Sequence, residues 1–215
     1  HGDSVGVQAA EVASAYGRHG DISIEPLVDT GDKYGEISFH SPFRFYAPLA
    51  VAAYKGGGIP VIAEYDVVVA GGGTAGAPAA ISAARKGVKT LLIEYLHGLG
   101  GISTFGFIGR YTAGYRKGFT AEIDAAMQTI APADHPRHIK KDSSDWPLDW
   151  KAEWYRKEAL KAGADIWFQT IAGGVLKNGG KIEGIIVYTP YGQGLIRCKR
   201  LIDSTGSADL AIAAG

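Results

Sequence analysis

From residue 65 onward, the apolar residues recur in a pattern that predicts alternating strands and helices. Residues 66–70 form a short β-branched run that ends in glycines, as is typical of a strand buried on both faces. The alanine-rich segment 75–86 follows, and Gly87 is placed to close it as a helix C-cap. Together with the apolar run 88–94, these segments predict a β-α-β unit with parallel strands.

The remainder of the domain is predicted to combine helices with an antiparallel meander. Glycine-containing turn signals at 178–180 and 191–192 separate runs of strand-forming residues. The predicted elements are helices at 119–130 and 150–162, a polar loop at 135–149, strands at 165–176, 181–189, 194–199 and 200–203, and a last helix that starts at Asp209. The predicted fold class is therefore α/β, with a parallel sheet and a small antiparallel β-meander.

The first 64 residues differ from the rest of the chain. They contain one apolar-periodic stretch, 5–16, that predicts a short helix, and then a sequence rich in glycine, aspartate and aromatic residues. A glycine run at 56–58 is typical of a linker. We therefore predict an irregular N-terminal extension over 1–64 and one domain over 65–215.

Charge and composition exclude several classes of function. Lysine plus arginine and aspartate plus glutamate both number 22, so no net positive field attracts nucleic acid or an anionic membrane. Cys198 is the single cysteine, which excludes an intrachain disulfide and a cysteine-based metal site. No apolar stretch approaches the roughly 20 residues of a membrane span. We predict a soluble protein of undetermined compartment, which begins at His1 either as a processed terminus or as a fragment boundary.

The loop between the first strand and helix carries a nucleotide-binding motif. Gly71, Gly73 and Gly76 have G-x-G-x-x-G spacing, which allows a tight turn, close approach of a pyrophosphate and close helix packing. Thr74 and Ala75 lie inside the motif, where the helix N-terminus favours an anion. About 20 residues further on, Glu94 ends the next strand, where an acid accepts hydrogen bonds from ribose hydroxyls. The alternative is a glycine turn that binds nothing.

At this point the chain resembles the FAD-dependent oxidoreductases of the glutathione-reductase type. Residues 99–104 (LGGIST) resemble the family's second glycine pair, and residues 201–206 (LIDSTG) resemble its later strand and turn beside FAD. The resemblance implies a Rossmann-like FAD-binding domain, incomplete at its C-terminus, whose meander contacts adenine near Ala172. The cofactor-binding residues predicted from the motif and the resemblance are Gly71, Gly73, Thr74, Ala75, Gly76, Glu94, Gly100, Gly101, Ser103, Thr104, Ala172, Thr205 and Gly206.

Candidate catalytic residues follow the second strand. His97 could face the flavin or link to it covalently, although a solvated loop histidine fits equally. Tyr111, Tyr115 and Arg116 could polarise a substrate, or they could be packing aromatics and a solvated charge. We predict no metal site, because the loop that carries Asp134, His135, His138 and Asp142 has no helical register that would bring these ligands together.

The sequence favours an FAD-dependent flavoprotein oxidoreductase that oxidises a small-molecule substrate by hydride transfer to flavin. One alternative is an NAD-binding dehydrogenase domain, which the second glycine pair and the meander disfavour. A second is a non-catalytic nucleotide-binding assembly subunit. A third is an enzyme that consumes its dinucleotide, as thiazole synthases do, although no suitably placed cysteine apart from Cys198 is present.

The end of the chain suggests a missing partner. Gly215 interrupts an alanine-rich helix whose apolar residues, 211–214, need cover. Trp146, Trp150 and Trp154 have a helical spacing that predicts one aromatic stripe. We expect a second polypeptide, or the missing C-terminal part of the same chain, to pack against both surfaces.

Overall fold

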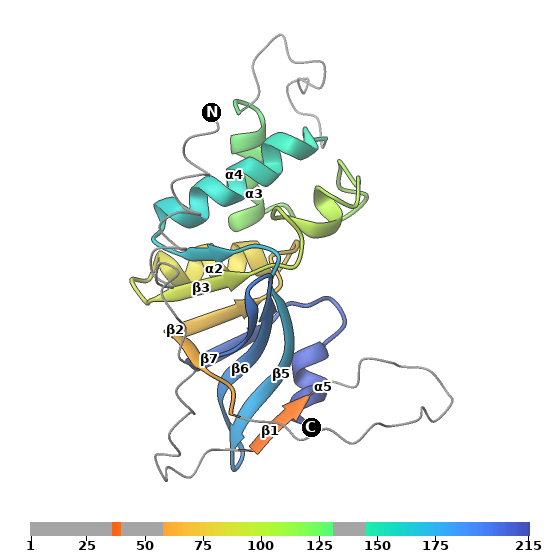
Figure 1. The fold of residues 1–215 in the computed structure, drawn as a ribbon. Helices are drawn as coiled ribbons and strands as arrows, with labels where there is room; N and C mark the ends of the chain where they lie inside the picture. Colours follow the sequence, from red (N-terminus) through yellow and green to blue (C-terminus); the bar gives the residue numbers. More distant parts are fainter. Residues whose placement is uncertain (1–35, 40–57, 131–144) are drawn as a thin grey trace, which may run out of the picture. The chain divides into compact units, whose positions relative to one another are not determined.

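The computed structural model describes residues 36–39, 58–130 and 145–215, and these form one mixed sheet with helices on it (Figure 1). The sheet has seven strands in the order β1-β5-β6-β7-β2-β3-β4. The elements are β1 (Glu36–Phe39), β2 (Val61–Ala70), α2 (Gly76–Ala84), β3 (Thr90–Ile93), the short 3-10 helix η1 (Gly101–Ser103), α3 (Phe119–Met127), α4 (Leu148–Lys161), β4 (Asp165–Trp167), β5 (Ile171–Asn178), β6 (Lys181–Thr189), β7 (Gly192–Asp203) and α5 (Asp209–Ala214).

The parallel half of the sheet contains the predicted β-α-β unit. β2 and β3 pair in parallel from Val67 opposite Thr90 to Ala70 opposite Ile93, and α2 connects them. β4 adds to the far side of β3, also in parallel. This pairing confirms the predicted α/β class with a Rossmann-like parallel sheet. Parallel strands need a crossover connection, and buried β-branched strands usually have a helix in that position.

The antiparallel half joins the parallel half through one shared strand. β7 pairs antiparallel with β6 over its first half and parallel with β2 over most of its length, so the predicted strands 194–199 and 200–203 are one strand. The predicted strand 165–176 is instead two strands, β4 in the parallel half and β5 in the meander. Alternation of apolar residues does not reveal that a chain leaves one strand and enters another.

The boundaries of the other elements lie close to those predicted, except at the start of the first parallel strand. β2 begins at Val61, five residues before its predicted start, and Val61 already pairs with Leu195 of β7. The predicted helix 5–16 lies outside the described residues. The four loop residues weighed as metal ligands, Asp134, His135, His138 and Asp142, also lie outside them. None of the described helices is both long and apolar enough to cross a membrane.

Two hydrophobic cores lie on opposite faces of the parallel strands, because successive strand residues point to opposite sides. Val69 and Leu92 pack with α2, α4 and the aromatic side chains beside α4. Val68 and Leu91 pack with the meander and α5. In Figure 1, α2, α3 and α4 accordingly lie to one side of β2 and β3, while α5 lies beside β5.

The chain itself covers part of the two surfaces that were expected to receive a partner. Trp146 and Trp154 are 6% and 8% exposed and belong to the α2–α4 core, and Trp146 precedes α4 rather than forming part of a helical stripe. On α5, Leu210 and Ala213 are buried against the core that contains β5. Packing inside the chain thus covers part of both surfaces, while Ala211 and Ile212 of α5 stay exposed, and the expected partner remains a prediction.

The covering of α5 predicts unequal effects of two substitutions on the same helix. Leu210 is fully buried, whereas Ile212 is 52% exposed. We expect Leu210→Ala to lower the free energy of unfolding by about 2–5 kcal/mol, because it leaves a cavity. Ile212→Ala should change it by less than about 1 kcal/mol. Urea unfolding followed by circular dichroism measures both, and equal effects would show that α5 does not pack as described.

Candidate cofactor site

The glycine loop is held by backbone contacts that leave no room for side chains. Gly71 has a positive φ of 96°, and a Cβ there would overlap the carbonyl oxygen of Ser204. A Cβ on Gly76 would overlap the Gly71 carbonyl oxygen in the same way. Only glycine fits these two positions. The loop therefore packs directly against the turn after β7 and against the N-terminus of α2.

Gly73 is free of such contacts. A Cβ built on it meets nothing within 4 Å, and Gly73 lines a cavity. Thr74 and Ala75, the next two residues, line the same cavity and are exposed. The first turn of a helix has backbone N–H groups without intrahelical partners and carries partial positive charge. This end of α2 can therefore bind an anion.

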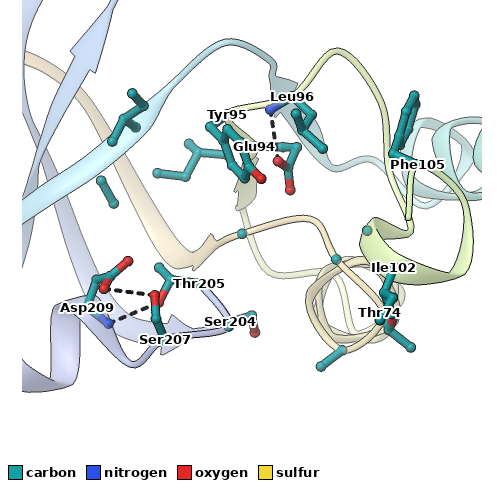
Figure 2. A pocket seen from close by; sticks show the side chains of 18 of the residues that line it. Thr74, Glu94, Tyr95, Leu96, Ile102, Phe105, Ser204, Thr205, Ser207 and Asp209 are labelled. Atoms are coloured by element: carbon teal, nitrogen blue, oxygen red, sulfur yellow. Dashed lines mark hydrogen bonds between the residues drawn. The ribbon is translucent and has the colours of Figure 1, made fainter. Parts of the chain in front are cut away.

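Glu94 holds the end of β3 against the glycine loop. Its side chain is buried, at 4% exposure, and its two carboxylate oxygens accept hydrogen bonds from the amides of Gly72 (2.7 Å) and Leu96 (2.9 Å). Figure 2 shows it beside Tyr95 in the cavity wall. A carboxylate has about four acceptor positions, so two remain for a ligand.

The second glycine pair packs against the first loop. Gly100 has a φ of 104° and donates from its amide to the Gly72 carbonyl at 2.8 Å. Thr74 Oγ1 donates to the Gly100 carbonyl at 3.1 Å. A Cβ on Gly101 would come within 2.9 Å of the Gly73 Cα, so this position also requires close backbone approach. η1 is thereby fixed beside α2, and Gly101 lines the cavity.

A third wall is the turn between β7 and α5, which Asp203 organises. One Asp203 oxygen accepts from the Thr205 amide (3.0 Å) and hydroxyl (2.7 Å), and the other accepts from the amides of Leu210 (3.0 Å) and Ala211 (2.9 Å). Burial opposes the charge of Asp203, but these hydrogen bonds outweigh it and lower the pKa of the carboxyl below its usual value. Thr205 and Gly206 are therefore held in the cavity wall.

The start of β5 completes the enclosure. The Thr170 amide donates to the Glu94 carbonyl at 3.1 Å, which places Ile171 and Ala172 beside the acid. The cavity has a volume of about 990 Å³, near the upper end of ordinary ligand sites. Its lining residues are Gly71, Gly73, Thr74, Ala75, Ile93, Glu94, Tyr95, Leu96, Gly101, Ile102, Phe105, Gly106, Thr170, Ile171, Ala172, Ser204, Thr205, Gly206, Ser207 and Asp209.

Four of the thirteen predicted cofactor residues lie behind the cavity wall instead of in it. Gly76 and Gly100 make the close backbone contacts described above. Ser103 and Thr104 are buried, and their hydroxyls donate to the carbonyls of Gly100 and Leu99, both at 2.8 Å. These four residues shape the loops that carry the lining residues.

None of the four candidate catalytic residues is among the residues that line the cavity. His97 is exposed and packs edge-on against Phe105, with ring centroids 4.8 Å apart. Tyr111 packs against Trp146 at 4.6 Å, and Arg116 forms an ion pair with Asp124 at 2.7 Å. Tyr115 is 82% exposed.

Several lining residues were not anticipated from the sequence. Tyr95 is 63% exposed beside Glu94, and Ile102 and Phe105 lie at the end of the cavity near η1 (Figure 2). Gly106 also lines the cavity. Tyr95 directly follows the acid that ends the strand, and this adjacency was a usable signal. Ser207 and Asp209 enter the wall only through the turn that Asp203 holds, which no local pattern indicates.

Several known proteins are similar to this chain. A digeranylgeranylglycerophospholipid reductase of Thermoplasma acidophilum is 34% identical over an alignment 139 residues long, which covers 56% of this chain and 34% of that protein. A thiamine thiazole synthase of Methanococcus vannielii is 31% identical over an alignment 152 residues long, which covers 66% of this chain and 56% of that protein. The chain thus spans about a third to a little over half of the length of these relatives.

A solved structure is similar as well. The crystal structure of a geranylgeranyl bacteriochlorophyll reductase-like protein from Thermoplasma acidophilum superposes with a TM-score of 0.51 at 27% identity, covering 71% of this chain and 42% of that one. Residues 66–215 match the family described as FAD dependent oxidoreductase. Because this match covers more than half of the sequence, the chain belongs to the family of FAD-dependent oxidoreductases.

Proposed function

We propose that this chain is the FAD-binding part of an oxidoreductase that oxidises a small-molecule substrate by transferring a hydride to flavin. The observation that carries the proposal is the single cavity that joins the glycine loop, Glu94, η1 and the turn after β7. Each wall supplies a feature that a different part of FAD requires. FAD, when bound, supplies the hydride chemistry itself.

The pyrophosphate of FAD fits the N-terminus of α2. The absence of a side chain at Gly73 leaves room for phosphate oxygens against the loop, and the helix amides attract their charge. Among the described lining residues there are two acids, Glu94 and Asp209, and no basic side chain. Backbone N–H groups of the loop and of the first turn of α2 would therefore bind the phosphates, because the hydroxyls of Thr74 and Thr205 already donate to Gly100 and Asp203.

The adenosine half fits between β3 and β5. The two free acceptor positions of the Glu94 carboxylate suit the two hydroxyls of a ribose. Tyr95 offers an exposed ring beside it, and Ile171 and Ala172 provide an apolar wall from the other side. This arrangement would hold the adenine ring between an aromatic face and an aliphatic surface.

The flavin would lie at the other end, beside η1. Gly101 and Gly106 expose backbone there, while Ile102 and Phe105 provide apolar contacts. These residues would orient the ring. Ile102 is 64% exposed, so one side of this end stays accessible to a substrate.

The buried position of the one cysteine disfavours an enzyme that consumes its dinucleotide. Cys198 is 6% exposed and packs in the core between β2, β6 and α5. Burial raises the pKa of its thiol to about 11, so the nucleophilic thiolate is scarce at neutral pH. Cys198 also does not line the cavity. Similarity to a thiazole synthase therefore supports a shared nucleotide-binding fold, not a shared sulfur chemistry.

The identity of the bound nucleotide tests the proposal directly. The purified chain should be yellow, with absorbance near 450 nm (roughly) from oxidised flavin. Mass spectrometry of the material released by denaturation should identify FAD. Release of NAD, or failure of the chain to bind added FAD, would refute the proposal.

We expect Gly73→Val to give a folded protein that does not bind FAD. The valine side chain has open space around it in the protein, but it occupies the position proposed for the phosphates. The matched control is Gly180→Val, which also meets no atom within 4 Å but lies in the turn between β5 and β6. Flavin content after gel filtration measures the effect. Wild-type content in the Gly73 variant would remove the loop from the site.

Glu94→Gln should weaken both the fold and FAD binding. A glutamine offers only one acceptor oxygen, so either the Gly72 or the Leu96 amide loses its partner, at a cost of about 1–3 kcal/mol. The affinity for FAD should fall about tenfold, because a charged acceptor for the ribose is lost. Urea unfolding and flavin titration measure the two effects. Glu183→Gln, which removes an acid of β6, should show neither, and an unchanged FAD affinity in Glu94→Gln would contradict the assignment.

The proposed contact of Tyr95 with adenine is testable without flavin. Tyr95→Ala should weaken binding of ADP about tenfold, the typical worth of one base stacked on an aromatic ring. Tyr95→Phe, which keeps the ring, should retain most of the wild-type affinity for ADP. Tyr191→Ala, at another exposed tyrosine, serves as the control. Calorimetric titration with ADP measures all three, and equal affinities in wild type and Tyr95→Ala would refute the contact.

A further inference from the structure

We propose that Lys151 is a positioning residue for the cofactor cavity. Its buried ammonium holds Trp146, and Trp146 in turn holds η1 against the glycine loop. Lys151 does not line the cavity and is not a catalytic residue. This inference rests on the proposed function, because it takes the cavity to be the site for FAD.

Lys151 lies in a cage of aromatic rings. Its side chain is 1% exposed, and Nζ lies 3.4 Å from the ring centroid of Trp146. The rings of Tyr111 and Tyr155 are 5.6 Å and 5.9 Å away. Ring faces carry partial negative charge, so all three attract the ammonium. The strongest of these contacts, by distance, is with Trp146.

The position of this lysine is unfavourable for the fold alone. Lys151 lies in the first turn of α4, where the helix dipole repels a cation. Burial also opposes its charge and lowers its pKa to about 8, although Asp124 partly offsets this. An apolar side chain of similar length would avoid both costs. The attraction of the surrounding rings, above all of Trp146, therefore offsets these costs.

Trp146 connects the cage to the cavity. Its Nε1 donates to the Ser103 carbonyl at 2.7 Å in a buried hydrogen bond. Ser103 Oγ donates to the Gly100 carbonyl at 2.8 Å, and the Gly100 amide donates to the Gly72 carbonyl, also at 2.8 Å. Gly72 is the residue that donates to Glu94. An unbroken series of contacts thus joins Lys151 to the glycine loop and the acid.

Among the titratable groups that face the cage, Lys151 is the first to change charge as the pH rises. Burial raises the pKa values of Tyr111 and Tyr155 above the usual range. Arg116 lies over the ring of Tyr111 at 5.2 Å and is paired with Asp124 of α3. Lys151, with a pKa of about 8, loses its proton before either tyrosine.

The titration of Lys151 distinguishes a positioning role from a structural one, because raising the pH changes the stability of the fold and the affinity for FAD in opposite directions. The pKa of Lys151 is lower in the folded protein, about 8, than its ordinary value of 10.5. Between these values the unfolded chain holds the proton that the folded chain has released, so this group makes the fold more stable as pH rises. The neutral amine no longer attracts Trp146, so the affinity for FAD falls over the same range.

The experiment compares the full chain with Lys151→Met, a neutral side chain of similar length, and with Lys161→Met as the control. Lys161 is on the same helix, with its side chain 77% exposed. Three quantities are measured at pH about 7 and about 9.5. They are the hydrogen exchange of the Ser103 and Thr104 amides without ligand, the Kd for FAD, and the thermal midpoint of unfolding.

We expect Lys151→Met to exchange the η1 amides about tenfold faster, to bind FAD about tenfold more weakly at the lower pH, and to unfold at no lower temperature. Wild type should lose affinity about tenfold between the two pH values, whereas Lys151→Met should show little change. Lys161→Met should behave as wild type. Wild-type exchange rates in Lys151→Met would overturn the inference.

A second variant covers the case in which Lys151→Met does not fold. Trp146→Phe keeps an aromatic face for Lys151 but removes the hydrogen bond to Ser103, so it should accelerate exchange at η1 in the same way. Unchanged exchange in Trp146→Phe would also overturn the inference. If wild type binds no FAD, the proposed function fails, and hydrogen exchange still decides the role of Lys151.

Discussion

The cavity depends on one constraint, which is the close approach of backbone to backbone around Gly71. The loop after β2 lies so near the turn after β7 and the start of α2 that neither Gly71 nor Gly76 has room for a Cβ. This approach places the N-terminus of α2 at the carboxyl ends of β2, β3 and β7, where open parallel sheets bind their ligands. A side chain at either position would move α2 and open the wall.

Polar contacts then fix the remaining walls to this loop. Glu94 connects the loop to the end of β3, and the amide of Thr170 connects β5 to the Glu94 carbonyl. Asp203 does the same for the turn before α5. Both acids therefore have a structural task in addition to any contact with a ligand. In a cavity whose described lining has no basic side chain, the helix N-terminus and backbone amides are the available partners for phosphates.

Much of this arrangement was predicted from the sequence, and the confirmed parts are those set by local chemistry. The β-α-β unit follows from the β-branched runs and from glycine spacing, and β6 has the predicted bounds of 181–189. Membership of the FAD-dependent oxidoreductases, inferred from the glycine pairs and the LIDSTG turn, is confirmed by the family match over 66–215. Glycine and acid positions are informative because few other residues can replace them.

Other features were decided only by the tertiary structure. Residues 165–176 divide between a parallel and an antiparallel strand, because pairing partners far away in sequence determine where a strand ends. Trp146 donates a buried hydrogen bond to Ser103, and Leu210 packs in the core that contains β5, and no local period encodes these contacts. The aromatic cage of Lys151 likewise combines Trp146 and Tyr155, which are near it in the sequence, with Tyr111 from a distant segment before α3. The sequence by itself determined which backbone could bind a dinucleotide, and long-range packing decided which side chains surround and support that site.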